Sequence, residues 1–318
     1  MNYFITGGAG FIGSNLADEL AKDPTNQITI YDNMSTGFKE FIEDLGSKKN
    51  VRIILGDVLD EKKLNDAIKG IDFVFHLSAN ADVRFGLEHP KKDLEQNTIA
   101  THNVLEAMRL NGVSKIAFSS TGSVYGEASV IPTPEDCPFP VQTSLYASSK
   151  LAGEALISSY CEGFGFTGYI FRFVSILGER YTHGHVFDFY KKLMENPKEL
   201  MVLGNGKQRK SYLYIKDCIN AMLTVIDKAN EAVNIYNLGT DEYCEVNDSI
   251  GWICEYLGLN PELVYSGGER GWVGDNPFIF LDCCRLKELG WSADLSIKGA
   301  VLRTVQYIEQ NTWIYDRR

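Results

Sequence analysis

The first 32 residues contain the feature that most constrains the fold. A short apolar run at 3–5 leads into the glycine-rich turn 6–13, which a helical stretch and a second apolar run ending at Asp32 follow. Because glycine has no Cβ, the backbone of such a turn can approach a pyrophosphate closely. The following helix points its N-terminal N–H groups at that phosphate. The segment therefore predicts a dinucleotide-binding βαβ unit, the alternative being an ordinary glycine-rich turn.

Asp32 lies about 20 residues beyond the glycines, where a carboxylate can accept hydrogen bonds from the ribose hydroxyls of NAD. A carboxylate at this place would repel the 2′-phosphate of NADP. The sequence therefore favours NAD as the cofactor, although the neighbouring residues Asn33, Ser35 and Thr36 are neutral and do not decide the choice alone.

Strand-like and helix-like segments alternate through the first half of the chain. Strand patterns occupy 51–55, 72–77, 115–120 and 168–173, and helix patterns occupy 61–68, 94–110 and 148–164. Strands separated by helix-length segments pair in parallel, with the crossovers on both faces of the sheet. We therefore predict a doubly wound α/β fold whose ligand cleft lies beyond the carboxyl ends of the strands. Residues 1–173 are predicted to form an NAD-binding domain, and 174–318 a smaller substrate domain partly interleaved with the sheet.

Composition narrows the classes of partner. The chain has 318 residues and a net charge of −11, which argues against binding to nucleic acid or to anionic membranes. No apolar run is long enough to span a bilayer, and the first strand begins too early for a signal peptide. The seven cysteines are odd in number and show no Cys-x-x-Cys spacing, so we expect free thiols in a reducing compartment. These observations predict a cytoplasmic protein.

A candidate catalytic group follows the strand at 115–120, which runs into Thr121. Downstream, Tyr146 and Lys150 are four residues apart, so on a helix they share a face. A phenol titrates near 10, but a nearby ammonium group favours the phenolate and lowers its pKa. Tyr146 is therefore a candidate general base, and the Thr121 hydroxyl could pass a substrate proton toward it. Taken alone, the tyrosine–lysine spacing would fit a surface pair near a helix start.

Together these motifs resemble the extended short-chain dehydrogenase/reductase family. Within that family they are most similar to the NAD-dependent nucleotide-sugar epimerases and dehydratases, and closest to UDP-glucose and UDP-N-acetylglucosamine 4-epimerases. The motifs that carry the resemblance are 6–14, 32–37, 56–58, 76–79, Asn97, 123–126 and the pair Tyr146 and Lys150. They are spread over essentially the full length of the chain.

The resemblance implies the residues that bind the cofactor. The pyrophosphate would be surrounded by Gly7, Gly10, Phe11, Ile12 and Gly13. The adenosine ribose would contact Asp32, Asn33, Ser35, Thr36 and Gly37, and the adenine would contact Asp57 and Val58. The cofactor channel would be lined by Leu77, Ala79 and Asn97, and the nicotinamide ribose would be bound by Tyr146 and Lys150. Thr121 would polarise the sugar oxygen, and Tyr146 would remove its proton.

The positions after Thr121 distinguish the members of the family. The 4,6-dehydratases carry an aspartate–glutamate pair there, and the sugar-acid decarboxylases usually carry a glutamate at the second position. This chain has Gly122 and Ser123, neither of which can act as an acid or base. An epimerase needs no further carboxylate, since a 4-keto intermediate only has to turn over. We therefore expect 4-epimerisation of a UDP-hexose, the alternatives being a dehydratase, decarboxylase or reductase of the same family, or a redox-inactive dinucleotide-binding regulator.

The same resemblance implies the residues that bind the substrate. They are Thr121, Gly122, Ser123, Tyr146, Ser175, Arg209, Lys210, Arg270 and Ile279. Lys210 occupies the position of the family's diphosphate-binding arginine, with Arg209 beside it, and both are expected in a loop. Ile279 stands where many galactose-type epimerases carry a tyrosine, which would leave room for a 2-acetamido group.

The dimer interface of relatives lies on the helices near 94–110 and 148–164. In this chain the second of these helices offers Leu151, Ala155 and Ile157 as an apolar face. By this analogy a homodimer is expected, with a UDP-sugar as the small-molecule partner.

Overall fold

A computed structural model describes residues 1–80, 88–139, 141–269 and 278–317. The chain clusters into two compact units. The first unit comprises Met1–Val124, Ser144–Arg172 and Met222–Tyr236, and the second comprises Tyr125–Thr143, Phe173–Ala221 and Asn237–Arg318. The proposed domain boundary between residues 173 and 174 remains a prediction.

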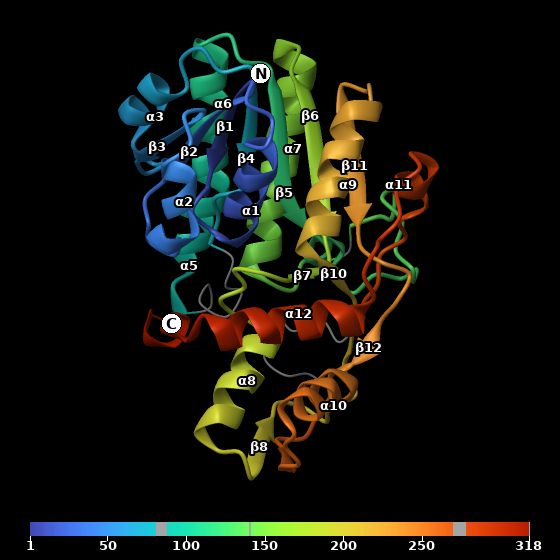
Figure 1. Cartoon of the computed structure of the whole chain (residues 1–318). Coiled ribbons are helices and arrows are strands. Elements are labelled where there is room, and N and C mark those ends of the chain that lie inside the picture. The colour runs from blue at the N-terminus through green and yellow to red at the C-terminus, as the bar shows by residue number, and fades with distance from the viewer. Residues whose placement is uncertain (81–87, 140, 270–277, 318) are drawn as a thin grey trace. The chain divides into compact units, whose positions relative to one another are not determined.

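The first unit contains a seven-stranded parallel sheet, which confirms the predicted fold class (Figure 1). Its strands are β1 (Asn2–Thr6), β2 (Gln27–Asp32), β3 (Val51–Leu55), β4 (Phe73–His76), β5 (Lys115–Thr121), β6 (Thr167–Phe173) and β11 (Val233–Leu238). They lie in the order β11-β6-β5-β4-β1-β2-β3, so the direction in which strands are added reverses between β1 and β4. Ligands of open α/β sheets bind at such a reversal.

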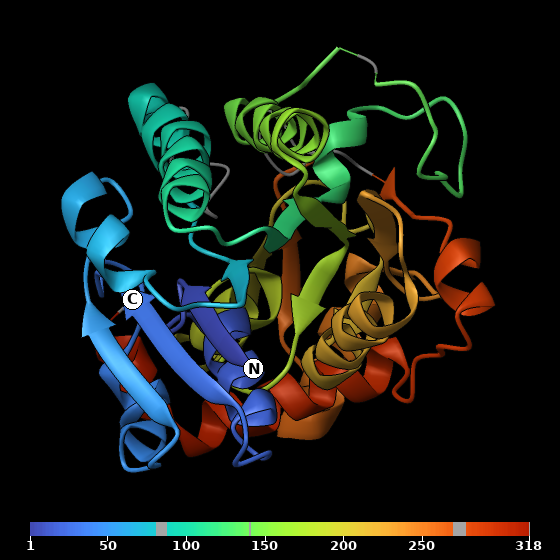
Figure 2. The same ribbon diagram turned by 90° about the horizontal axis from the view of Figure 1, so that it is seen from above.

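Helices cover both faces of this sheet (Figure 2). One face carries α3 (Glu61–Ala67), α6 (Ala100–Leu110) and α7 (Leu145–Phe164), and the other carries α1 (Phe11–Leu20) and the part of α9 (Ile215–Lys228) that begins at Met222. The core beneath α6 and α7 is continuous and includes Val104, Leu105 and Met108. Such burial of one apolar helix face is what stabilises helices of this length.

Two details of these helices differ from the sequence predictions. The helix expected at 94–110 follows a short helix, α5 (Pro90–Asp93), and begins as a π-helical segment at Leu94–Ile99 before α6 continues it. Within that segment Asn97 is buried and hydrogen-bonded, and such segments often occur at functional sites. Ile157, predicted on an exposed apolar face of α7, is fully buried in the core because it faces the sheet.

The second unit consists of small sheets and helices. Its strands are β7 (Ser175–Leu177) paired with β10 (Tyr212–Tyr214), β9 (Arg209–Lys210) between β12 (Cys244–Glu245) and β14 (Phe278–Ile279), and β8 (Glu199–Val202) paired with β13 (Glu262–Tyr265). Its helices are α8 (His185–Glu195), α10 (Val246–Leu257), α11 (Cys284–Glu288) and α12 (Ile297–Gln310), and α12 packs against α8 and α10 (Figure 1). In the part of the chain that the structure describes, no helix has both the length and the apolar character that a bilayer crossing requires.

Candidate active site

The glycine-rich turn lies between β1 and α1 and is held by its own backbone. Gly7 adopts a φ of +68°, which favours glycine, and its N–H donates to the carbonyl of Tyr31 over 3.0 Å. Gly10 precedes α1, whose first residues Phe11 and Ile12 are half-buried. A Cβ on Gly13 would lie 2.2 Å from the carbonyl oxygen of Gly7. The turn and the helix therefore pack backbone against backbone, as a close pyrophosphate approach requires.

Asp32 ends β2 beside this turn and is buried. Its Oδ2 accepts from the N–H of Ala9 over 2.9 Å, and its Oδ1 accepts from the N–H of Met34 over 2.8 Å. Burial raises the pKa of Asp32, although the hydrogen bonds from the two N–H groups partly offset this increase. Each carboxylate oxygen has two lone pairs, so acceptor capacity remains for ribose hydroxyls.

The segment after Asp32 is fixed to its surroundings by short contacts. Asn33 donates from Nδ2 to Asp57 over 2.8 Å and accepts at Oδ1 from the N–H of Ser35. A Cβ on Gly37 would lie 2.9 Å from that of Ala9, so Gly37 lies against the glycine-rich turn. Among the other predicted adenosine-binding residues, Thr36 is exposed and Val58 is buried.

Asn97 connects the segment after β4, where cofactor-binding residues are predicted, to α7. Its Nδ2 donates to Oγ of Ser149 over 2.8 Å, and its Oδ1 accepts from the N–H of Asn80 over 2.8 Å. Ser149 in turn donates to the carbonyl of Tyr146 over 2.8 Å. Leu77 and Ala79 follow β4 and are half-buried. The structure thus gathers these residues at the carboxyl ends of the strands, where the sequence placed them.

One buried chain of hydrogen bonds at this edge was not predicted from the sequence. Thr6 contacts Nδ1 of His76 over 2.8 Å, and Nε2 of the same ring contacts Thr101 over 3.0 Å. Burial lowers the pKa of His76 to about 3, so the ring is neutral. Thr6 also accepts from the N–H of Leu77, which leaves its own proton for the ring. The only sequence signal was a histidine within an apolar strand.

The predicted catalytic residues come together from β5 and α7. Thr121 is the last residue of β5, and α7 begins at Leu145 with Ser144 as its N-cap. A hydrogen bond links Thr121 to Tyr146. Lys150 is fully buried and donates from Nζ to the carbonyl of Ser119 over 2.7 Å. Its ammonium group also lies 4.7 Å from the ring centroid of Phe118, a cation–π distance.

The charges of this pair differ from the sequence prediction. Burial raises the pKa of Tyr146 to about 12, with Asp93 adding to the increase and Thr121 opposing it. Burial lowers the pKa of Lys150 to about 7, although the charges of Glu154 and Asp93 partly offset this decrease. The expectation of a lowered Tyr146 pKa is wrong for this structure, because loss of water around the phenol outweighs the Thr121 hydrogen bond and the Asp93 charge adds to the increase.

The turn after Thr121 has no acid or base at the two positions that distinguish family members. Gly122 and Ser123 begin a short 3₁₀ turn, Gly122–Tyr125, and the N–H of Ser123 donates to Oγ1 of Thr121 over 3.1 Å. That bond orients the Thr121 hydroxyl, since its oxygen then accepts from one side.

The remaining predicted substrate residues belong to the second unit. Ser175 is exposed in β7, opposite Tyr212. Arg209 and Lys210, which were expected in a loop, instead form β9, because this stretch pairs with β12 and β14. Arg270 lies outside the described residues.

Arg209 and Lys210 point to opposite faces of β9, since consecutive strand residues alternate. The guanidinium carbon of Arg209 lies 3.9 Å from the ring centroid of Phe278, its cross-strand neighbour. Lys210 is paired with Ile279, and both are half-buried. Burial, together with the charge of Lys210, lowers the pKa of His185 to about 3. Lys210 is therefore a cation on the His185 side of this sheet.

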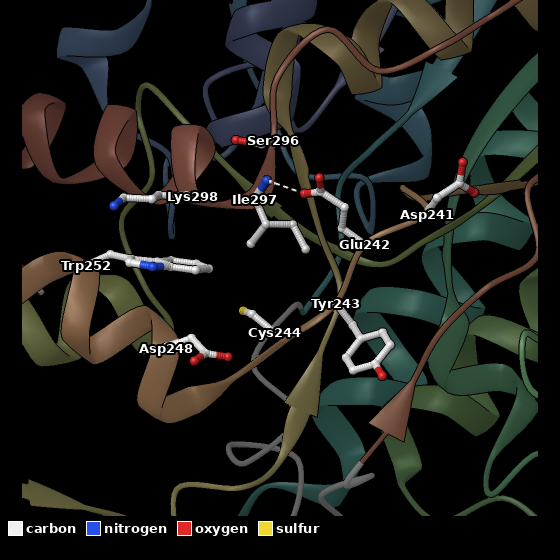
Figure 3. A pocket seen from close by; sticks show the side chains of 9 residues that line it. All are labelled: Asp241, Glu242, Tyr243, Cys244, Asp248, Trp252, Ser296, Ile297 and Lys298. Atoms are coloured by element: carbon white, nitrogen blue, oxygen red, sulfur yellow. Dashed lines mark hydrogen bonds between the residues drawn. The ribbon is translucent and has the colours of Figure 1, made fainter.

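An open hollow of about 450 Å³ also lies in the second unit (Figure 3). It is lined by Asp241, Glu242, Tyr243, Cys244, Asp248, Trp252, Ser296, Ile297 and Lys298. None of the predicted site residues is among these. Its acidic groups have structural partners: Glu242 accepts from the N–H of Ile297, and Asp248 accepts from the N–H of Glu245.

The model of the NAD dependent epimerase/dehydratase family matches residues 3–239. This chain belongs to that family. NAD is therefore its cofactor, as the sequence predicted. The turn at Gly7 to Gly13 fits that cofactor because the absence of a side chain at Gly13 lets the turn pack against α1, and the oxygens of Asp32 keep acceptor capacity for a ribose.

Several relatives of the chain carry the names of UDP-sugar enzymes. It is 33% identical to a protein of Methanocaldococcus jannaschii provisionally named UDP-glucose 4-epimerase, over 96% of this chain and 98% of that one. It is also 33% identical to the UDP-N-acetyl-alpha-D-glucosaminuronate decarboxylase of Bacillus cytotoxicus, over 96% and 97% of the two chains. A solved UDP-galactose 4-epimerase is 34% identical and superposes with a TM-score of 0.87, over 98% and 100% of the two chains.

Proposed function

We propose that this chain catalyses the NAD-dependent 4-epimerisation of a UDP-hexose through a transient 4-keto intermediate. The observation that carries the proposal is the grouping of Thr121, Tyr146 and Lys150 at the end of β5, followed by Gly122 and Ser123. These residues can move one proton at a sugar oxygen. They offer no further carboxylate to expel water or assist decarboxylation.

The residues of the first unit then have defined roles. Gly7, Gly10 and Gly13 let the backbone approach the pyrophosphate, Asp32 accepts from the adenosine ribose, and Lys150 donates to the nicotinamide ribose. NAD held there would supply hydride transfer to and from C4 of the sugar. In its phenolate form, which the Lys150 ammonium group favours against the burial that raises the pKa of Tyr146, this residue would take the proton of the C4 hydroxyl and later give it back, with Thr121 sharing the oxygen.

Lys210 is our candidate for the cation that binds the substrate diphosphate. Arg209 is held against Phe278 on the opposite face of β9, where its planar group stacks on the ring. Lys210 shares its side of the sheet with Ile279, the residue that we propose to border the sugar. Arg270 and Ser175 remain proposed substrate residues.

We propose that the sugar pocket admits a 2-acetamido group. Ile279 replaces a tyrosine at a position that restricts the pocket in many galactose-type epimerases. Isoleucine is shorter than tyrosine and carries no hydroxyl, so UDP-N-acetylglucosamine should be accepted as well as, or better than, UDP-glucose.

A homodimer in the cytoplasm completes the proposal. Leu110 of α6 and Phe164 of α7 are 64% and 55% exposed, which fits an interface formed by these helices. The seven cysteines are all free thiols, as a reducing compartment would keep them. Sedimentation analysis would test the oligomeric state.

The deciding experiment is to incubate the purified enzyme separately with UDP-galactose, UDP-N-acetylglucosamine and UDP-glucuronic acid. We expect the C4 epimer of at least one UDP-hexose by NMR, with no net NADH. Release of CO₂ from UDP-glucuronic acid would identify a decarboxylase, and a stable keto-deoxy sugar would identify a dehydratase. Net NADH consumption would identify a reductase. Bound NAD without conversion of any sugar would favour the regulator.

A further inference from the structure

Glu154 is a buried carboxylate on the same face of α7 as the candidate catalytic residues. It follows Lys150 by four residues, just as Lys150 follows Tyr146, so the three side chains occupy successive turns. Three consecutive residues of β5 meet this face. Thr121 bonds to Tyr146, and the carbonyl of Ser119 accepts from Lys150. The hydroxyl of Ser120 donates to Glu154, which makes Glu154 the third contact between α7 and the end of β5.

Arg172 fixes the other side of the Glu154 carboxylate. Arg172 lies in β6, and both side chains are almost fully buried. Its Nε donates to Oε1 of Glu154 over 3.0 Å and its Nη2 to Oε2 over 2.7 Å, a bidentate arrangement. A buried ion pair gains little stability over apolar residues of similar volume. The position of Glu154, one helical turn after Lys150, therefore suggests a role besides stability.

The titratable side chains around Lys150 differ in their charge and in their effect on its pKa. His76 on β4 is neutral because burial lowers its pKa to about 3. Burial raises the pKa of Tyr146 to about 12. Glu154 on α7 and Asp93 on α5 are the carboxyl groups that raise the Lys150 pKa, and Glu154 has the larger effect. Glu154 has this effect although its carboxylate is paired with Arg172.

We propose that Glu154 is a positioning residue for Lys150: held by Ser120 and Arg172, it fixes the reactive face of α7 against β5 and supplies the negative charge that keeps Lys150 an ammonium group. This inference rests on the proposed function, in which Lys150 acts as a cation at the nicotinamide ribose. Without the charge of Glu154, burial would favour the neutral amine.

The test is the substitution Glu154→Gln, which keeps the shape and removes the charge. Burial lowers the pKa of Lys150, and Glu154 opposes this effect. Lys150 is an ammonium group below its pKa and loses its proton as the pH rises through that value. In the variant this loss should occur at lower pH, by about one unit, which at a fixed alkaline pH means about tenfold less ammonium relative to amine. Titration of ε-13C-labelled lysine by NMR measures it directly, with the Lys150 signal assigned by its absence in Lys150→Met. The alkaline limb of the activity profile should move in parallel.

Two further variants keep the outcome decisive. Glu154→Gln leaves the Arg172 charge buried without its partner, which can destabilise the variant enough to prevent folding. The double variant Glu154→Gln with Arg172→Met removes both charges, and its Lys150 midpoint should also fall. Glu106→Gln is the matched control, since Glu106 on α6 pairs with Arg109 and accepts from Tyr160 of α7, whereas the carboxyl groups that raise the Lys150 pKa are Glu154 and Asp93.

An unchanged Lys150 midpoint in a folded Glu154 variant would overturn the inference, as would an equal shift in Glu106→Gln. Uniformly lower activity with an unchanged pH profile would leave Glu154 a purely structural role and would likewise overturn it. Failure of the proposed function has a different signature, namely that Tyr146→Phe stays active. The NMR midpoint reports on Glu154 in either case.

Discussion

Replacement of Gly13 by alanine adds only one methyl group but should disable the cofactor site. The Cβ would lie 2.2 Å from the carbonyl oxygen of Gly7 and 2.8 Å from Cα of Gly8. Real Cβ atoms essentially never come closer than 3.0 Å to another heavy atom. Both neighbours are backbone, so no side chain can rotate away. The turn and α1 must therefore separate by about 0.8 Å (3.0 − 2.2 = 0.8).

That separation has two consequences of known size. Overpacking of this kind costs about 1–3 kcal/mol, of which the better helix propensity of alanine returns at most about 1 kcal/mol. A displaced helix N-terminus also loses hydrogen bonds to the pyrophosphate. One charge-assisted bond is worth about 1.5–3 kcal/mol, so NAD should bind about 10- to 100-fold more weakly. The loss of affinity should thus exceed the loss of stability.

Calorimetric titration of the NAD-free enzyme with NAD measures the first effect, and urea unfolding measures the second. Gly163→Ala is the matched control, because a Cβ there meets nothing within 4 Å. Its helical position should gain about 0.5–1 kcal/mol of stability at unchanged NAD affinity. If Gly13→Ala bound NAD as tightly as the wild type, the backbone-to-backbone packing described for the turn would be refuted.

Three further outcomes are expected. Tyr146→Phe should abolish epimerisation while NAD stays bound, as checked by product NMR and by the dinucleotide released on denaturation; retained turnover would exclude Tyr146 as the base. Lys210→Ala should raise KM for the UDP-sugar about 10-fold or more, which is the size of one lost charge-assisted hydrogen bond. Arg209→Ala should mainly lower stability. If instead Arg209→Ala raised KM and Lys210→Ala did not, Arg209 would be the cation that binds the diphosphate. Ile279→Tyr should lower kcat/KM for UDP-N-acetylglucosamine more than for UDP-glucose, and equal losses would contradict the assigned pocket position.

The features that could be predicted from sequence are those that depend on local spacing. Tyr146 and Lys150 share a face of α7 because four residues make about one helical turn, whatever the rest of the chain does. The turn at Gly7 and Gly13 needs glycine because a neighbouring backbone segment passes within van der Waals range. The alternation of strands and helices likewise indicated a parallel sheet, because parallel neighbours need crossover connections.

The pairing of distant residues could not be read in this way. Thr6 and His76 are 70 residues apart in sequence, and Glu154 and Arg172 contact each other because α7 lies over β5 and β6. The lower pKa of Lys150 has the same origin, since burial belongs to the packed chain and not to its sequence neighbours. Pairing with β12 and β14 likewise decided that Arg209 and Lys210 form a strand and face opposite ways. The sequence by itself determined the family, the cofactor and which residues are chemically capable, whereas tertiary structure decided their charges and their partners, because desolvation and long-range contacts exist only once the chain is folded.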